Sequence, residues 1–357
     1  MASMNNESTP VVRKETKNRI SVDYEGKLSF KERLKQKLKA SNTWITAGVN
    51  FVRFILMLGV SFVILYPFIA RIANSFMTKE DVLDATVSLV PKNPTLEIYQ
   101  AIIVENNYLE GFINTLLLSL MCAIIQTMVA CLIGYGLAKF KFKGNTAVMI
   151  AVIVTMVIPH TALQTSLLKH FEMFDIGTVI SWGYAGPIEL ITGQSANLMY
   201  SFWPMFILSI GGLAFKNGLY IYLMRQFFKG VPDELEESAY VDGSGVFRTF
   251  VQIIIPLAVP MMITIFLFAF SWQWTDEFYY GIFFLTERES LKVTLMPDMY
   301  RTMPPSLVPG KGYGASTLYR NIVQNTAGML IIAPLIIMYL FCQRYLVEGI
   351  ERSGIVG

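Results

Sequence analysis

Few residues in this chain are placed for bond-making chemistry. The two histidines, His160 and His170, fall in no HExxH pattern, and no CxxC pair occurs, so the spacing indicates no metal site. The three cysteines, Cys122, Cys131 and Cys342, lie in apolar runs and are too few for a disulfide framework. No phosphate-binding loop of the form GxxxxGK(S/T) is present. We therefore expect no catalytic residue, no metal and no cofactor bound by this chain.

A second set of candidates consists of polar and aromatic side chains inside or at the end of long apolar runs. Lys216 and Asn217 interrupt one run, Gln126 lies inside another, and Trp272 ends a third. A lysine buried in a membrane is costly and usually functional, so these four residues are candidates for lining a substrate path. The alternatives are helix packing or a subunit contact for the polar residues, and an interfacial aromatic belt for Trp272.

The composition supports a membrane location for these runs. Of 357 residues, 54% are hydrophobic and only 15% are charged, and the mean hydropathy is +0.48. Soluble proteins carry about 25% charged residues. This chain has too few polar side chains to cover soluble domains of its length, which argues against a soluble enzyme, a nucleic-acid-binding protein and a disordered chain. An all-α integral membrane protein is predicted.

Six apolar stretches come close to the roughly 20 residues that a membrane-spanning helix needs. They are residues 51–73, 111–137, 146–168, 203–224, 250–272 and 326–341. Residues 169–202 mix glycine, proline, acids and short apolar runs, and we interpret them as an external insertion.

The basic residues predict which side of the membrane each loop faces. The two ends and the loops at 138–145 and 225–248 carry 18 Lys/Arg, against 8 in the longer intervening loops. Basic residues favour the cytoplasmic side, so both termini are expected there. The expected domains are a basic N-terminal tail (1–49), a six-span domain (50–343) and a C-terminal tail (344–357). Within the first tail, Leu28–Leu38 is either an amphipathic helix on anionic lipid or part of a solvated segment.

The cytoplasmic loop at 225–248 is predicted to be rigid. Pro232 suits a first helical position, and Asp233 favours a helix start through its charge. This helix should run to about Val241, where the Asp-Gly-Ser-Gly sequence that contains Gly243 ends it. A second helix then leads into the fifth span. Two short helices joined at a glycine corner form an elbow that can pass force into the membrane.

The elbow carries a motif that resembles the permease subunits of bacterial ABC importers. The family pattern is Glu-Ala-Ala, three residues, Gly, nine residues, Ile, one residue and Leu-Pro. In this chain it reads Glu237-Ser238-Ala239, Gly243, Ile253 and Ile255-Pro256. The segments RQFFKGVPDELEESAYVDG, GYGLAKFKFKG and QRYLVEGIERSGIVG are similar to the carbohydrate importers of the maltose-transporter type. The long N-terminal tail, the insertion near residues 180–202 and Gly245 depart from the family pattern.

The resemblance implies a type I ABC importer fold in the bacterial cytoplasmic membrane. Two related permeases form one pore, two cytoplasmic ATPases use ATP and Mg, and an extracytoplasmic solute-binding protein delivers a sugar. This chain is then one multi-pass permease, surrounded by lipid, without ATPase activity and without a nucleic-acid partner. The resemblance assigns ATPase coupling to Glu237, Ser238, Ala239, Asp242, Gly243 and Pro256. It assigns a tail contact with an ATPase to Gln343, Glu348 and Gly349.

Three other functions account for part of the sequence. An ABC import permease for a non-sugar solute fits the same motif, because only the resemblance indicates a carbohydrate. An ion-gradient-driven transporter or a channel accounts for six spans but leaves the elbow unexplained. A membrane-embedded enzyme lacks paired acids, clustered histidines or an activated nucleophile at one depth.

Overall fold

The computed structural model describes residues 12–15, 21–24, 41–175, 186–286, 288, 292–308 and 315–354. The chain divides into two compact units, Met1–Ala70 and Arg71–Gly357. The predicted amphipathic helix at Leu28–Leu38 lies outside the described residues.

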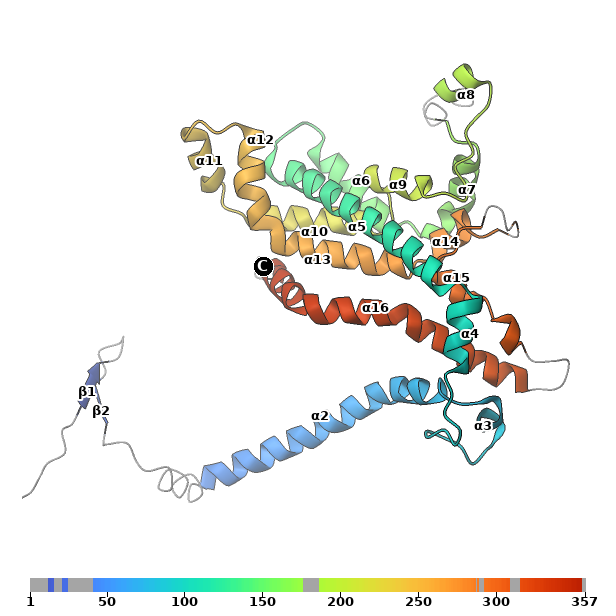
Figure 1. Cartoon of the computed structure of the whole chain (residues 1–357). Coiled ribbons are helices and arrows are strands. Elements are labelled where there is room, and N and C mark those ends of the chain that lie inside the picture. The colour runs from blue at the N-terminus through green and yellow to red at the C-terminus, as the bar shows by residue number, and fades with distance from the viewer. Residues whose placement is uncertain are drawn as a thin grey trace, which may run out of the picture. The chain divides into compact units, whose positions relative to one another are not determined.

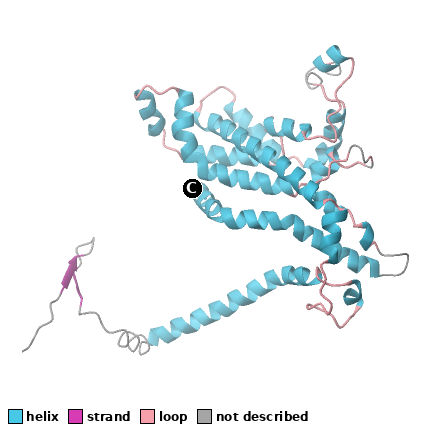
Figure 2. Ribbon diagram, viewed as in Figure 1, coloured by secondary structure: helices cyan, strands magenta, loops and turns pink. Residues whose placement is uncertain are grey.

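The first unit contains a β-hairpin and most of one long helix. Strands β1 (Val12–Glu15) and β2 (Ser21–Tyr24) pair antiparallel, with Val12 opposite Tyr24. This hairpin lies within the polar tail, where no strand was predicted from the sequence. The long helix α2 (Ser41–Asn74) contains the first predicted span and continues across the boundary between the units. Figure 2 shows that the described strands are confined to this N-terminal region, while helices and loops make up the rest.

The second unit is built from helices and loops in its described part. In chain order the elements after α2 are α3 (Lys79–Leu83), α4 (Glu97–Glu105), α5 (Tyr108–Lys139), α6 (Asn145–Val157), the 3₁₀ helix η1 (His160–Leu163), α7 (Gln164–Glu172), α8 (Pro187–Thr192), α9 (Trp203–Ile210), α10 (Asn217–Lys229), α11 (Glu234–Val241), α12 (Val246–Thr249), the π-helical turn η2 (Phe250–Ile254), α13 (Ile255–Trp274), α14 (Glu277–Phe283), α15 (Met296–Arg301), the 3₁₀ helix η4 (Pro305–Leu307) and α16 (Ala315–Gly354).

Helices α5, α10 and α13 form the centre of this unit. They run side by side, and α16 packs along α13 (Figure 1). Apolar residues from all three helices are buried in one core, including Ala130, Met224 and Ile265. Gly134 allows α5 and α10 to approach closely, because a Cβ atom there would lie 2.6 Å from the Cβ atom of Met224 and 3.0 Å from the Arg225 nitrogen. The core therefore depends on backbone contact as well as on apolar side chains.

Four of the predicted spans correspond to continuous helical segments. Those long and apolar enough to cross a membrane are Gly48–Asn74, Tyr108–Lys139, Val246–Trp274 and Thr317–Leu346. They extend the predicted first, second, fifth and sixth spans at one or both ends. The fifth passes through the π-helical turn just before Pro256, whose ring nitrogen has no proton to donate to the helix ladder.

The third and fourth predicted spans are wrong as continuous helices. The third bends by 97° between Asn145–Val157 and His160–Glu172. Pro159 lies at the break, and the residue before it, Ile158, is extended, as the ring of a following proline favours. The fourth is divided into α9 and α10 by a turn in which Gly212 has φ 68° and Lys216 has φ 65°. Six spans therefore remain a prediction.

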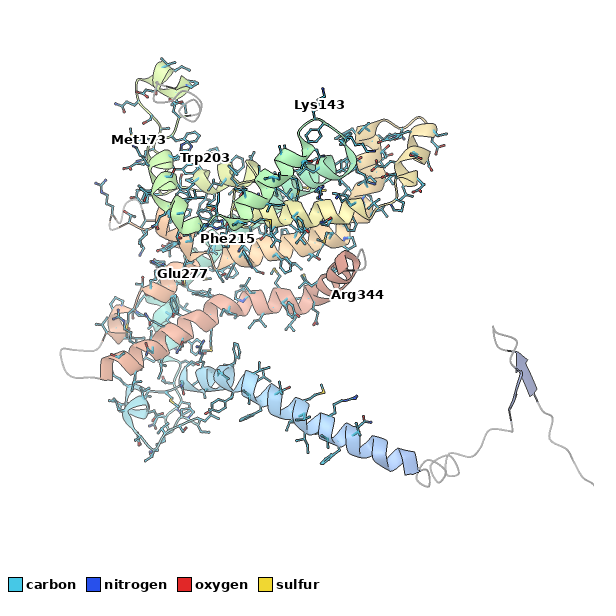
Figure 3. All side chains as sticks on the ribbon, turned by 180° about the vertical axis from the view of Figure 1, so that it is seen from behind. Lys143, Met173, Trp203, Phe215, Glu277 and Arg344 are labelled. Carbon is cyan, nitrogen blue, oxygen red and sulfur yellow. The ribbon has the colours of Figure 1, made fainter. Side chains whose placement is uncertain are left out.

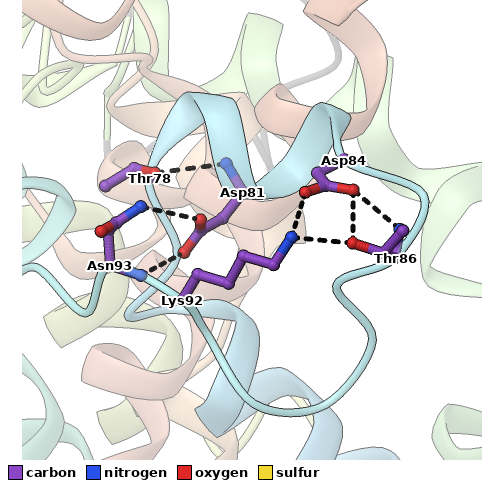
Figure 4. A network of polar contacts seen from close by, with 6 residues as sticks. All are labelled: Thr78, Asp81, Asp84, Thr86, Lys92 and Asn93. Atoms are coloured by element: carbon purple, nitrogen blue, oxygen red, sulfur yellow. Dashed lines mark hydrogen bonds and ion pairs between the residues drawn. The ribbon is translucent and has the colours of Figure 1, made fainter.

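A polar network organises the segment between α2 and α4 (Figure 4). The Asp81 carboxylate accepts hydrogen bonds from the backbone and side-chain nitrogens of Asn93, at 2.9 and 3.4 Å. Lys92 pairs with Asp84 and donates to the Thr86 hydroxyl at 2.8 Å. The hydrogen bond from Lys92 holds the pKa of Asp84 below its usual range. These contacts fold the connection back on itself.

The close approach at Gly134 generates a prediction about stability. Gly134→Ala should lower the stability of the folded protein by about 1–3 kcal/mol, because the new methyl group overlaps the α10 backbone. Gly136→Ala is the matched control, since no heavy atom lies within 4 Å of a Cβ there. Alanine at position 136 should leave stability unchanged or raise it slightly through helix propensity. The thermal midpoints of both variants in detergent check this, and equal midpoints would contradict it.

Candidate functional site

The predicted elbow is formed by α11 and α12. Helix α11 ends in a hydrogen-bonded corner: Gly243 N donates to Tyr240 O at 3.0 Å, and Ser244 N donates to Ala239 O at 2.9 Å. This pairing is the Schellman arrangement, which requires a left-handed residue after the helix. Gly243 supplies it with φ 82°. The glycine corner predicted from the sequence is therefore present.

All acidic residues of the elbow are exposed except one. Glu237, Ser238 and Asp242 are exposed, whereas Glu236 and Ala239 are buried. Ser238 and Ala239 are the two small residues of the motif. Ala239 lies one helical turn after Glu236, on the same buried face of α11. Of the two small residues, the outward one is Ser238.

Two apolar residues flank the glycine corner, and the sequence analysis did not single them out. Val241 is 87% exposed and Phe247 is 78% exposed. They lie on either side of the Asp-Gly-Ser-Gly break. The position of this break in the sequence could have indicated both residues. Pro256 lies in the first turn of α13, beyond the π-helical turn, and is not part of the elbow itself.

Aromatic packing supports the base of the elbow. The Tyr135 ring lies 5.4 Å from the Phe228 ring and 4.6 Å from the Phe250 ring, measured between centroids. These three residues come from α5, α10 and η2. The end of α10, which precedes the elbow, and the start of the fifth span therefore both pack against Tyr135. Val231 is buried in the same core. The elbow therefore has a fixed support.

The acids of α11 have different electrostatic environments. Asp233 is exposed, and a hydrogen bond from Lys139 lowers the pKa of its carboxyl. Burial raises the pKa of Glu236, and the adjacent Lys139 opposes that rise. Glu237, the acid of the motif, is solvated on the outer face. Its exposed carboxylate is therefore available to a partner.

Lys216 and Trp272 meet at a cavity between the α9–α10 break and α14. The Lys216 Nζ lies 4.6 Å from the centre of the Trp272 ring and 4.9 Å from the centre of the Phe215 ring. Both distances allow a cation–π contact. The cavity has a volume of about 380 Å³ and is lined by Phe215, Lys216, Trp272, Thr275, Asp276, Glu277 and Phe278. Figure 3 labels two of these lining residues, Phe215 and Glu277, which come from separate parts of the chain.

Gln126 lines a small recess that shares residues with this cavity. Phe215, Trp272 and Asp276 border both spaces. The Gln126 side chain donates to the Ser209 hydroxyl at 3.3 Å, so it also contributes to packing between α5 and α9. Three of the four predicted path residues, from three separate apolar runs, therefore lie together.

Asn217 does not line this cavity, contrary to its prediction as a path residue. It is fully buried at the start of α10, and its amide atoms have no hydrogen-bond partner among the described residues. The sequence analysis also missed Phe215 and Asp276 as lining residues. Asp276 had no recognisable signal, because its approach to Lys216 depends on the break between α9 and α10.

The predicted C-terminal tail continues the last helix. Helix α16 runs to Gly354 without a break at residue 343. Gln343 is exposed, and its side chain donates to Leu340 O at 3.1 Å. The backbone of Glu348 and Gly349 is helical, and the Glu348 side chain lies outside the described part of the chain.

Comparison with known proteins identifies the class of molecule. The family model described as "Binding-protein-dependent transport system inner membrane component" matches residues 126–352. A probable starch degradation products transport system permease protein of Thermoanaerobacterium thermosulfurigenes is 27% identical over 290 residues, which cover 81% of this chain and 90% of the relative. The maltodextrin transport system permease protein MalD of Streptococcus pneumoniae is 25% identical over 326 residues, covering 90% and 97%.

A solved structure supports the same fold. A chain of a bacterial ABC transporter involved in import of the acidic polysaccharide alginate matches with a TM-score of 0.59 and 20% identity, over 90% of this chain and 99% of that chain. The predicted α-helical membrane fold is thereby confirmed, and the chain is a multi-pass protein of the cell membrane. The family match includes both halves of the elbow and supports a transport subunit over an ion-driven transporter or an enzyme. The chain belongs to the family of binding-protein-dependent transport system inner membrane components.

Proposed function

We propose that this protein is one of two permease subunits of an ATP-driven sugar importer, and that α11 and α12 couple it to cytoplasmic ATPases. The observation that carries the proposal is the elbow. Its glycine corner and aromatic support keep it rigid, and it presents Glu237 outward. A rigid projecting element of this kind can transmit the closure of an ATPase into the helices behind it.

The proposed substrate is an oligosaccharide. The relatives described above are named for starch degradation products and maltodextrin. The cavity joins an aromatic face at Trp272 to charged groups at Lys216, Asp276 and Glu277. Sugars present both an apolar C–H face and hydroxyl groups, which fit such a mixed lining. This chemistry supports Lys216, Trp272 and Gln126 as path residues, with Phe215 and Asp276 added.

The proposed partners follow from the transport class. They are a second, related permease, two ATPases that bind ATP and Mg, and an extracytoplasmic solute-binding protein. A bacterial alginate transporter of similar fold was solved in complex with an alginate-pentasaccharide-bound periplasmic protein. This chain would hold no nucleotide itself. The end of α16, including Gln343, Glu348 and Gly349, is proposed as a further ATPase contact.

Charge reversal at the elbow tests the coupling function. Glu237→Lys should lower sugar uptake at least tenfold in the reconstituted complex, because it replaces the exposed carboxylate that would pair with a basic ATPase residue. Gly243→Asp should act similarly by straining the left-handed corner. Gly245→Asp is the matched control, since Gly245 has φ −78° and caps α12, where aspartate is favoured. Normal uptake by Glu237→Lys and Gly243→Asp in assembled complexes would refute the coupling role.

Truncation of Trp272 tests the substrate path. Trp272→Ala should lower uptake about tenfold, equivalent to roughly 1.4 kcal/mol, because the sugar loses its aromatic surface. Trp272→Phe should keep most of the activity. Trp203→Ala is the control, because Trp203 is also partly exposed but does not line the cavity. Uptake of labelled maltodextrin into proteoliposomes measures all three variants. Similar losses for Trp203→Ala and Trp272→Ala would remove the path assignment.

Labelling from outside the cell tests the proposed six-span topology. Single cysteines at exposed positions 93 and 194, in a chain whose own three cysteines are replaced, should react with a membrane-impermeant maleimide. A cysteine at position 230 should react only after the membrane is permeabilised, since that position precedes the elbow. Reaction of all three sites from the same side would overturn the topology.

A further inference from the structure

Lys139, the last residue of α5, has an environment unlike its basic neighbours. Lys141 and Lys143 are exposed, whereas the Lys139 side chain is only 7% exposed. A buried ammonium group needs hydrogen-bond acceptors to offset the loss of hydration. The Lys139 Nζ finds two, donating to Val231 O at 2.6 Å and to Asp233 Oδ1 at 2.5 Å.

Both acceptors lie at the start of the elbow. Val231 precedes Pro232, and Asp233 is the residue before the first turn of α11. Lys139 therefore connects the C-terminal end of α5 to the N-terminal end of α11, two elements separated by more than 90 residues in the chain. The ammonium also lies at the negative end of the α5 dipole, and the carboxylate lies at the positive end of the α11 dipole.

Other polar contacts hold the same end of α5. Arg225 Nε donates to Leu137 O at 3.4 Å, and Asn145 Nδ2 donates to Leu137 O and Phe140 O at 3.2 and 3.0 Å. The free carbonyl groups of the helix end are thereby used to join α10 and α6 to α5. The end of α5 is thus fixed to its neighbours on several sides.

The connection matters because α5 also reaches the cavity. Gln126 lies 13 residues before Lys139 on the same helix, about 20 Å away at about 1.5 Å per residue. The covalent route from the elbow leads into α13 through the π-helical turn. A second route, through Lys139, leads into α5.

We propose that Lys139 is a positioning residue that couples the elbow to α5. Movement of α11 then displaces α5 and the Gln126 side of the cavity together with α13. This inference rests on the proposed coupling function. It adds a specific non-covalent contact that sets how much transport each ATP drives.

The test uses the complete reconstituted complex with its ATPases, second permease and solute-binding protein. In Lys139→Met, the number of maltodextrin molecules transported per ATP hydrolysed should fall about tenfold, while hydrolysis continues. Lys141→Met is the matched control and should keep the wild-type ratio. Lys139→Arg should keep most of the wild-type transport ratio, because arginine can donate to both acceptors. A loss of packing alone would not be rescued by the larger arginine side chain.

Two further measurements keep the inference testable if Lys139→Met fails to assemble. Asp233→Asn removes the charge pair at a side chain that is 78% exposed, so it should fold, and it should lower the transport ratio in the same direction. Amide hydrogen exchange in residues 231–245 should speed up in Asp233→Asn and not in Lys141→Met. A wild-type ratio with unchanged exchange in Asp233→Asn overturns the inference. If Glu237→Lys also transports normally, the proposed coupling function is wrong. This result distinguishes failure of the coupling function from failure of the Lys139 inference alone.

Discussion

Backbone amide and carbonyl groups in an apolar environment have no water to bind, and the rest of this structure depends on that constraint. A continuous helix satisfies them internally, so a break is tolerated where other protein groups or a cavity replace the missing bonds. The α9–α10 break borders the cavity at Lys216. The π-helical turn before Pro256 lies where the elbow joins the fifth span. These two irregular backbone segments therefore occur beside the two regions for which we propose a function.

The same constraint explains how far the sequence could be interpreted. Four of the predicted apolar runs are long helical segments in the structure. They could be predicted because length and hydropathy are sufficient to identify a helix that is apolar on most sides. The other two runs contain residues that mark a break, Pro159 and Lys216, but the 97° bend and the left-handed backbone of Lys216 could not be predicted from hydropathy. The elbow was predictable because proline, acidic residues and a glycine corner are local signals. The inward position of Ala239 was not, because it depends on which face of α11 meets α5.

The elbow and the cavity are properties of one connected unit. Tyr135 of α5 packs against both Phe228 and Phe250, and Lys139 of the same helix contacts the start of α11. Gln126 brings α5 to the recess beside Trp272 and Asp276. A single helix therefore has one end in the support of the elbow and its middle beside the proposed substrate path. Rigid helices with defined contacts at both places are what force transmission across a membrane requires.

The backbone of Lys216 has a consequence for protein engineering. A residue other than glycine in the left-handed region costs about 1–3 kcal/mol, which the surrounding contacts must offset. A laboratory selection for thermal tolerance would therefore be expected to favour glycine at position 216, where the strain disappears. The resulting protein would survive heating better but would lack the ammonium group above Trp272. At this position, thermal stability and the proposed recognition of the solute place opposite demands on one residue.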